Sequence, residues 1–215
     1  MQNSRIMDYF SRSEVSNSDL TKLKQELFPS EIHDPTEAYK FGTLIDMMIT
    51  EPDKVNYFKY TCDGQQYTPE DFEKAKQMKR SFMNDPMAKQ MLEYSDFQKI
   101  MVRESMEFDY DVPFSLPVRC KWDLWMPVAQ FGGDIKSTVA TSQKQFEDAA
   151  RFFDYDRQRY FYMRIAGSQK DVLIGISKVN FKVFKIPIEY GDDFWKSGRD
   201  KTNFLAFKYW QLFAA

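Results

Sequence analysis

The chain has 215 residues, of which 43% are hydrophobic and 17% aromatic, and this composition excludes an intrinsically disordered protein. A formal net charge of −2 excludes a strongly basic chain, although a local basic groove and a carboxylate site both fit a near-neutral total. The two cysteines are far apart and form no CxxC pair, which argues against a zinc site, an iron–sulfur cluster or a disulfide framework. Because no run of about 18 apolar residues and no apolar leader occurs, we expect a cytoplasmic protein that does not enter a membrane.

The first hundred residues are predicted to be mainly helical. Ser18 is the expected N-cap of the first helix, and Pro29 ends that helix. Gly42 lies inside the second helix, where it costs about 1 kcal/mol relative to alanine and is typical of close packing. Asp63 and Gly64 indicate a tight turn between two short extended segments. The predicted helices of this part cover residues 19–28, 34–50, 69–83 and 86–95.

From residue 101 the spacing of apolar residues changes from helical to strand-like. The predicted strands cover residues 101–110, 116–126, 128–135, 171–178 and 181–187. The predicted helices of this part cover residues 142–153, 155–165 and 192–212. We therefore expect one α/β (α+β) domain over residues 1–215, with a mixed central sheet flanked by helices. Its first part, 1–100, is an N-terminal helical elaboration, and 101–215 hold the sheet.

Two neighbouring strands of this sheet carry ionisable residues among apolar ones, namely Asp123 on one and Asp134 and Lys136 on the next. Residues two apart on a strand face the same side, so Asp134 and Lys136 share a face, and Asp123 joins them if the strands pair. A divalent cation relieves the repulsion between two carboxylates, and oxygen ligands favour Mg²⁺ or Mn²⁺. With a lysine beside it, such a cation suits hydrolysis of a phosphodiester. A D-x-K strand alone is more often a surface ion pair.

Four sequence blocks in order, over about residues 41–162, carry a family resemblance. They are FGTLIDMMITEP, VRCKWDLW, GGDIKST and DYDRQRYFY. Together they resemble the RecE-type and RecB-type exonucleases of the PD-(D/E)XK superfamily, in its phage and prophage branch. The resemblance implies a restriction-endonuclease-like core. With only two cysteines, the chain is similar to the members that hold no iron–sulfur cluster.

The resemblance implies roles for individual residues. Asp123 and Asp134 correspond to metal ligands, helped by the backbone carbonyl of Ile135, and Lys136 corresponds to the catalytic lysine. Asp46 stands where the family has a histidine in its glycine-containing helix. It is either an additional metal ligand, since Asp suits Mg²⁺, or the sign of a weakened site or of a misleading alignment.

Two further pairs of residues are candidates by resemblance. Gln158 and Tyr162 match the Q-x-x-x-Y helix motif, whose side chains contact the substrate phosphate or support the lysine, and they share one helix face. The alternative is a half-buried polar patch. Glu104 and Glu107 lie where the family has an acidic residue near the metal, or they are ordinary strand surface.

The implied activity is a Mg²⁺-dependent DNA exonuclease, with Mn²⁺ as the alternative metal. By resemblance it acts on duplex ends in phage-type recombination, in a bacterial or phage-infected host cell, beside a single-strand annealing protein and as a homo-oligomer. The basic helix around Lys74–Arg80, with Lys144 and Arg151, either contacts DNA phosphates or is a solvated face. Two other interpretations stay open: a catalytically weak or inactive DNA-binding or interaction module on the same fold, and a structural phage protein that binds no metal.

Overall fold

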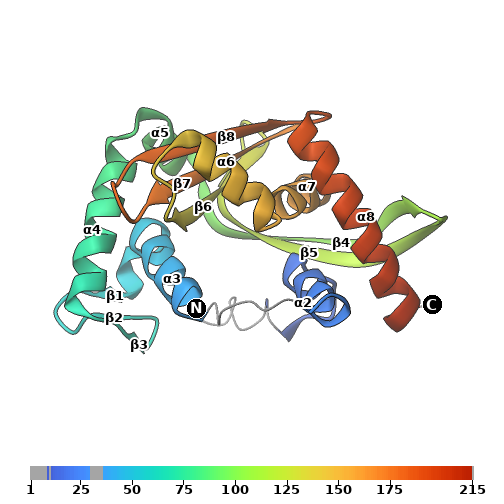
Figure 1. Ribbon diagram of the computed structural model, residues 1–215, viewed down its shortest axis with the longest axis horizontal. Coiled ribbons are helices and arrows are strands. Elements are labelled where there is room, and N and C mark those ends of the chain that lie inside the picture. The colour runs from blue at the N-terminus through green and yellow to red at the C-terminus, as the bar shows by residue number, and fades with distance from the viewer. Residues whose placement is uncertain (1–8, 10, 30–35, 215) are drawn as a thin grey trace.

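The computed structural model describes residues 9, 11–29 and 36–214, and a five-stranded sheet forms its centre (Figure 1). The strands follow one another across the sheet in chain order as β4 (Asp96–Tyr110), β5 (Val112–Met126), β6 (Phe131–Thr138), β7 (Lys170–Ser177) and β8 (Val183–Glu189). All neighbours are antiparallel except β6 and β7, which run parallel. A parallel pair needs a long crossover, and α6 (Gln143–Phe152) and α7 (Tyr155–Ala166) supply it. The predicted mixed sheet flanked by helices is confirmed.

The remaining helices lie on both sides of this sheet. They are α2 (Asn17–Leu27), α3 (Thr36–Thr50), α4 (Pro69–Asn84), α5 (Pro86–Tyr94) and α8 (Asp193–Phe213). A 3₁₀ turn and a small antiparallel sheet separate α3 from α4, namely η1 (Pro52–Lys54), β1 (Val55–Asn56), β2 (Thr61–Cys62) and β3 (Gln65–Gln66). In Figure 1, α3, α4 and α5 gather on the left, and α2 and α8 lie on the right beside the β4–β5 hairpin.

Several predicted element starts need correction. Strands β4 and β5 begin at Asp96 and Val112, five and four residues earlier than expected. The N-cap of α2 is Ser16 and not Ser18, because Ser16 and Asp19 form a capping box in which each side chain accepts from the other residue's backbone N–H. Strand β6 begins at Phe131, three residues later than expected. The preceding segment is the turn between two antiparallel strands, where Val128 is 98% exposed and Gln130 has a φ of 55°. The predicted start of α3 before Thr36 lies outside the described residues.

The sheet buries one hydrophobic cluster on each face. Toward α3, α4 and α5 it presents Ile135, Val172, Ile174 and Ile176. Toward α6, α7 and α8 it presents Trp122, Leu173 and other apolar side chains. Because adjacent strand residues point to opposite faces, Asp134 and Lys136 face α7, on the other side of the sheet from Ile135. In the part of the chain that the structure describes, no helix has the length and apolar character needed to cross a bilayer.

Candidate active site

Strands β5 and β6 part near the middle of the sheet, and the candidate site lies where they part. They pair over three residue pairs only, the last being Leu124 with Gly133. Beyond this pair the side chain of Asp123 replaces the backbone ladder, because its Oδ2 accepts a hydrogen bond from Ile135 N at 2.9 Å. The divergence of two strands therefore leaves room for side chains instead of backbone pairing.

Asp134 and Lys136 come from β6 at this point and form an ion pair of 2.5 Å between Oδ2 and Nζ. Asp134 is 2% exposed, whereas 21% of the Lys136 side chain is exposed. Burial lowers the pKa of Lys136, but the carboxylates of Asp134 and Asp123 outweigh that effect and raise it overall. The ammonium also lies 5.1 Å from the centre of the Tyr155 ring. Lys136 is therefore charged, held from two sides and still open to solvent.

Asp46 reaches the same region from α3. Burial, the largest effect, and the nearby Asp134 carboxylate together raise the pKa of Asp46 to about 6, against the lowering effect of Lys121. Gln98 Nε2 donates a hydrogen bond of 3.1 Å to Asp46 Oδ2. Asp46 thus interacts electrostatically with the β6 carboxylate, and its role as an additional ligand stays a prediction.

These carboxylates fit a divalent cation in charge and donor type. Burial raises the pKa of Asp123 well above its usual value, and Asp46 and Asp134 raise it further. Three carboxylates that disfavour one another's charge are relieved by a bound cation. Within the described residues, no three His, Cys, Asp or Glu side chains already surround one point as a metal shell does. Asp134 is turned toward cationic side chains instead.

Sequence reasoning missed Arg159, a fully buried guanidinium on α7. It lies 3.5 Å from Asp134 Oδ1 and 3.5 Å from Asp171 Oδ2, which itself comes from β7. Its Cζ stands 4.9 Å from the Trp122 ring centre and 4.4 Å from that of Tyr162. Burial lowers the pKa of Arg159, but Asp171 and Asp134 raise it overall, so the guanidinium is charged. Arg159 therefore connects the helix to the acidic end of β6.

The two residues of the Q-x-x-x-Y motif take different positions. Tyr162 is buried, and its ring packs against Trp122 at 5.4 Å between centres and under Arg159. Gln158 is half-buried, and its Oε1 accepts no hydrogen bond from any described residue. Tyr162 thus lies against Arg159, which pairs with Asp134, and a phosphate contact by Gln158 or Tyr162 stays a prediction.

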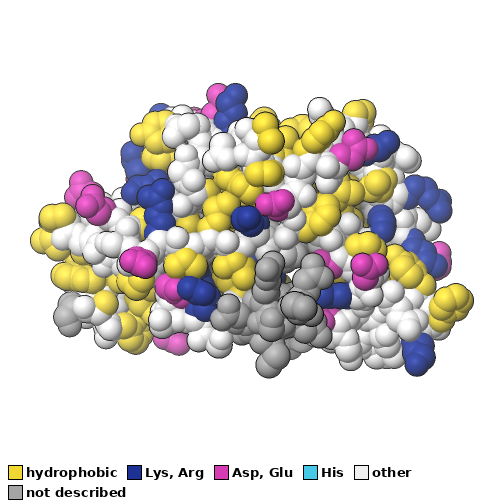
Figure 2. Space-filling view, turned by 180° about the vertical axis from the view of Figure 1, so that it is seen from behind, with side chains coloured by type: hydrophobic (Ala, Val, Ile, Leu, Met, Phe, Trp, Pro, Cys, Tyr) yellow, Lys and Arg dark blue, Asp and Glu magenta, His cyan; other side chains and the backbone are white. Residues whose placement is uncertain are grey.

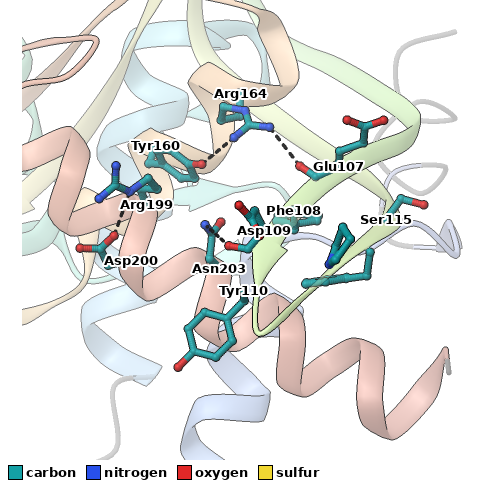
Figure 3. A pocket seen from close by; sticks show the side chains of 12 residues that line it. Glu107, Phe108, Asp109, Tyr110, Ser115, Tyr160, Arg164, Arg199, Asp200 and Asn203 are labelled. Carbon is teal, nitrogen blue, oxygen red and sulfur yellow. Dashed lines mark hydrogen bonds and ion pairs between the residues drawn. The ribbon is translucent and has the colours of Figure 1, made fainter.

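Glu104 and Glu107 are not brought to this site. Glu104 is exposed on β4, and Glu107 lines a separate hollow of about 970 Å³ that none of the site carboxylates touches. Figure 3 shows Arg164 in this hollow, donating to the hydroxyl of Tyr160 and to the backbone carbonyl of Glu107. The surface interpretation of both glutamates is the one that the structure supports.

The predicted basic surface is mostly a solvated helix face. Lys76 pairs with Glu73 at 2.6 Å, Lys144 with Asp148 at 2.6 Å, and Lys79 donates to the carbonyl of Met48. On the face shown in Figure 2, positive side chains occur in small groups among hydrophobic and acidic ones. Any contact with a polyanion on that face is therefore made by local groups of cations.

A family model described as a PDDEXK-like domain of unknown function (DUF3799) matches residues 9–213. The chain belongs to this PDDEXK-like family. Its fold is similar to that of a candidate exonuclease from Eubacterium rectale, with 17% identity, 86% of this chain and 70% of that chain covered, and a TM-score of 0.55. A phage related exonuclease from Haemophilus somnus 129PT aligns with 8% identity over 91% of this chain and 82% of that chain, with a TM-score of 0.46. No curated protein matches the sequence.

The family match confirms the predicted PD-(D/E)XK resemblance and, with the Eubacterium rectale structure, the restriction-endonuclease-like fold. In the described residues of this PDDEXK-like chain, the one place where strand carboxylates, a strand lysine and a helix carboxylate meet is the parting of β5 and β6.

Proposed function

We propose that this PDDEXK-like protein is a Mg²⁺-dependent deoxyribonuclease that removes nucleotides from DNA ends. One observation carries the proposal: Asp123, Asp134 and Lys136 meet where β5 and β6 part, with Lys136 open to solvent. Two acids and a lysine where two inner strands part suit hydrolysis of a phosphodiester, whose transition state gains negative charge.

Asp123 and Asp134 would hold the cation, with the carbonyl of Ile135 and the carboxylate of Asp46 as further ligands. Mg²⁺ prefers such oxygen ligands, and Mn²⁺ accepts the same set. When bound, the cation supplies an acidified water and charge stabilisation at the phosphoryl group. Asp134 must then turn part of its carboxylate away from Lys136, which frees that ammonium for the substrate.

Lys136 supplies the positive charge that contacts the substrate in the proposed site. Its ammonium rests between the Asp134 carboxylate and the Tyr155 ring, so a phosphate oxygen can replace one of these contacts without exposing an unpaired charge. In this position it orients the attacking water or stabilises the charge that develops on the phosphoryl oxygens.

In this proposal, residues of α7 hold Asp134 in place and contact the substrate. Tyr162 and Arg159 together fix the position of Asp134 from below the sheet surface. Gln158 has a buried amide oxygen without a hydrogen bond from the described residues, so its side chain is available to a ligand or to a water bound by one. We assign the substrate-phosphate contact to Gln158 and the supporting position to Tyr162.

The test is digestion of a linear duplex and of a closed circular duplex with Mg²⁺. Lys136→Ala is compared with the wild type, and Lys170→Ala is the matched control, because Lys170 pairs with Glu189 on the surface of the same sheet. We expect the wild type to digest the linear duplex and to leave the closed circle intact. Lys136→Ala should lower the rate of this digestion roughly a hundredfold or more. The control should digest DNA like the wild type.

Other outcomes have definite meanings. Nicking of the circle keeps the site but makes the enzyme an endonuclease. DNA binding without cleavage in Mg²⁺ or Mn²⁺ overturns the proposal and favours the binding module, which the aspartate at position 46 keeps as the second candidate. By resemblance, such an exonuclease serves phage-type recombination beside a single-strand annealing protein and as a homo-oligomer, and these partners are proposals that follow only from a positive digest.

A further inference from the structure

Two phenylalanines lie side by side on the surface where α6 meets α7. Phe152 is 79% exposed and Phe153 is 60% exposed. We call this pair the aromatic corner. Leaving two large rings in water forgoes the free energy that their burial would give. An exposed apolar group of this kind next to a candidate active site is a candidate contact surface.

The aromatic corner is held in one conformation by charged neighbours. Asp154 follows it with a φ of 56°, a left-handed backbone geometry that few residues other than glycine adopt. Its carboxylate binds Lys24 from α2 and Lys201 from α8, the latter at 2.9 Å. Two helices far apart in sequence thus fix the turn that presents the rings. A surface preset in this way loses little conformational freedom when it binds.

A row of rings leads from the aromatic corner to the candidate catalytic lysine. The ring centres of Phe152 and Phe153 are 5.0 Å apart, and those of Phe153 and Tyr155 are 5.9 Å apart with planes at 31°. Tyr155 in turn lies 5.1 Å below Lys136 Nζ. Tyr39, which is 65% exposed on α3, is near enough to contribute to the raised pKa of Tyr155, after the larger effect of burial.

Lysines gather near the end of β6, the strand that carries Lys136. Lys178 N donates a hydrogen bond of 2.7 Å to Thr138 O at this end. The side chain of Lys178 reaches over the Phe41 ring and helps to line a hollow of about 270 Å³. The charged residues lining the hollow are Glu37, Lys40, Asp71, Lys74 and Lys178. Three lysines against two acids make this hollow attractive to phosphate groups.

A row of rings that leads to Lys136, with further lysines near the end of the same strand, matches the chemistry of a single nucleic-acid strand. Each nucleobase has a flat face that stacks on an aromatic side chain, and its backbone follows positive charge. Bases inside a duplex already stack on one another, so only unpaired or terminal bases have a face to offer. An uncharged helix face or a zwitterionic lipid surface would match the rings but not the lysines.

We propose that the aromatic corner is a stacking subsite for unpaired nucleobases of a DNA strand whose phosphate lies at Lys136. The inference rests on the proposed nuclease function and gives its substrate class: DNA with a frayed or single-stranded end. Phe153 stacks the base nearest the cleaved bond, and Phe152 supports the next base or the edge of the same one.

The test measures binding of the full chain to a labelled single-stranded oligonucleotide and to the matching blunt duplex, with Ca²⁺ in place of Mg²⁺. A terminal 2-aminopurine reports stacking through its fluorescence. The variants are the double substitution Phe152→Ala with Phe153→Ala, and Phe153→Trp. Phe58→Ala is the matched control, because Phe58 is 97% exposed in the turn between β1 and β2. Melting temperatures check that each variant is folded.

We expect the double substitution to weaken single-strand binding roughly tenfold or more and to abolish 2-aminopurine quenching. Blunt-duplex binding should change much less, and Phe153→Trp and Phe58→Ala should bind like the wild type. Unchanged single-strand binding in the double variant overturns the inference, even where Lys136→Ala abolishes cleavage and the nuclease function stands. If binding depends on the two rings but the protein never cleaves DNA, the stacking subsite is supported and the proposed nuclease function is wrong. Loss of self-association without loss of DNA binding would make the corner an interface between copies and overturn the subsite.

Discussion

At the scale of single residues, the unusual feature of the site is the charge that it concentrates away from water. In addition to burial, Asp46 and Asp134 both raise the pKa of Asp123, and Asp134 also raises the pKa of Asp46, while Lys136 opposes both shifts. Like charges held together destabilise a fold unless a ligand neutralises them. Functional sites often carry such a cost in stability.

Asp46→Asn should therefore stabilise the metal-free protein while it weakens the site. The substitution removes one of the three carboxylates and keeps the hydrogen bond from Gln98 in reach. We expect the unfolding free energy at neutral pH to rise by about 1–2 kcal/mol. This is less than a pKa raised to about 6 would give for a fully buried group, because Asp46 is partly exposed. Urea unfolding in EDTA measures this gain. Added Mg²⁺ should stabilise the wild type more than the variant, and equal stabilisation would remove Asp46 from the ligand set.

Arg159 is the residue whose loss should cost most. Its guanidinium is 0% exposed and neutralises Asp134 and Asp171 at once. Arg159→Met keeps the packing volume but removes the ion-pair partner of the buried Asp171 and leaves Asp134 with Lys136 alone, so we expect a loss of about 3–5 kcal/mol of unfolding free energy. Arg159→Lys keeps the charge without the planar fork and should lose less. A methionine variant as stable as the wild type in urea would show that the two carboxylates do not need this cation.

At the scale of elements, alanine substitutions at two glycines inside helices should change the stability of the fold in opposite directions. A Cβ on Gly42 would meet its nearest neighbour, Ser137 Oγ, at 3.9 Å, which is an ordinary contact. A Cβ on Gly198 would stand 2.2 Å from the carbonyl oxygen of Asp156, where α8 crosses α7. Close packing, which the sequence suggested for Gly42, is therefore found at Gly198 instead.

Gly42→Ala should raise the unfolding free energy by about 0.5–1 kcal/mol through helix propensity alone. Gly198→Ala should lower it by about 1–3 kcal/mol, because α7 and α8 must move apart. Thermal melts of both variants measure the two signs in one experiment. If Gly42→Ala were stable but lost DNA cleavage, the glycine would serve close approach of the substrate, since it faces the strand that carries Lys136.

The same scale shows what a sequence pattern can and cannot predict. Period two on β6 placed Asp134 and Lys136 on one face, and chain adjacency placed Asp123 beside them. Arg159 lies one position after Gln158, and no local pattern tells which side of a mostly buried helix meets the sheet. Asp171 begins a buried strand, where nothing near it in sequence indicates a partner on α7. Such contacts depend on how layers pack, which a single sequence does not encode locally.

At the scale of the whole molecule, one aspartate ties the beginning and the end of the described chain to the middle. Asp154, at the α6–α7 turn, binds Lys24 on α2 and Lys201 on α8. Lys201 also reaches Asp156 at 2.9 Å. Burial raises the pKa of Asp154, but the hydrogen bonds from Lys24 and Lys201 outweigh it and lower the pKa below its usual value. The ionised carboxylate therefore stabilises the folded chain.

The lowered pKa of Asp154 predicts how the stability of the fold changes at acidic pH. An acid whose pKa is lowered by folding stabilises the protein above its unfolded pKa of about 3.9, and the contribution is lost as pH falls through the folded pKa. Asp154→Asn keeps a residue that tolerates the left-handed turn but removes the charge. At pH 7 we expect the variant to lose about 1–2 kcal/mol of unfolding free energy, a modest value because 44% of the Lys24 side chain is exposed. The difference should shrink below about pH 4 and vanish near pH 2, as measured by urea unfolding across this range. A difference independent of pH would mean that the turn depends on the shape of Asp154 and not on its charge.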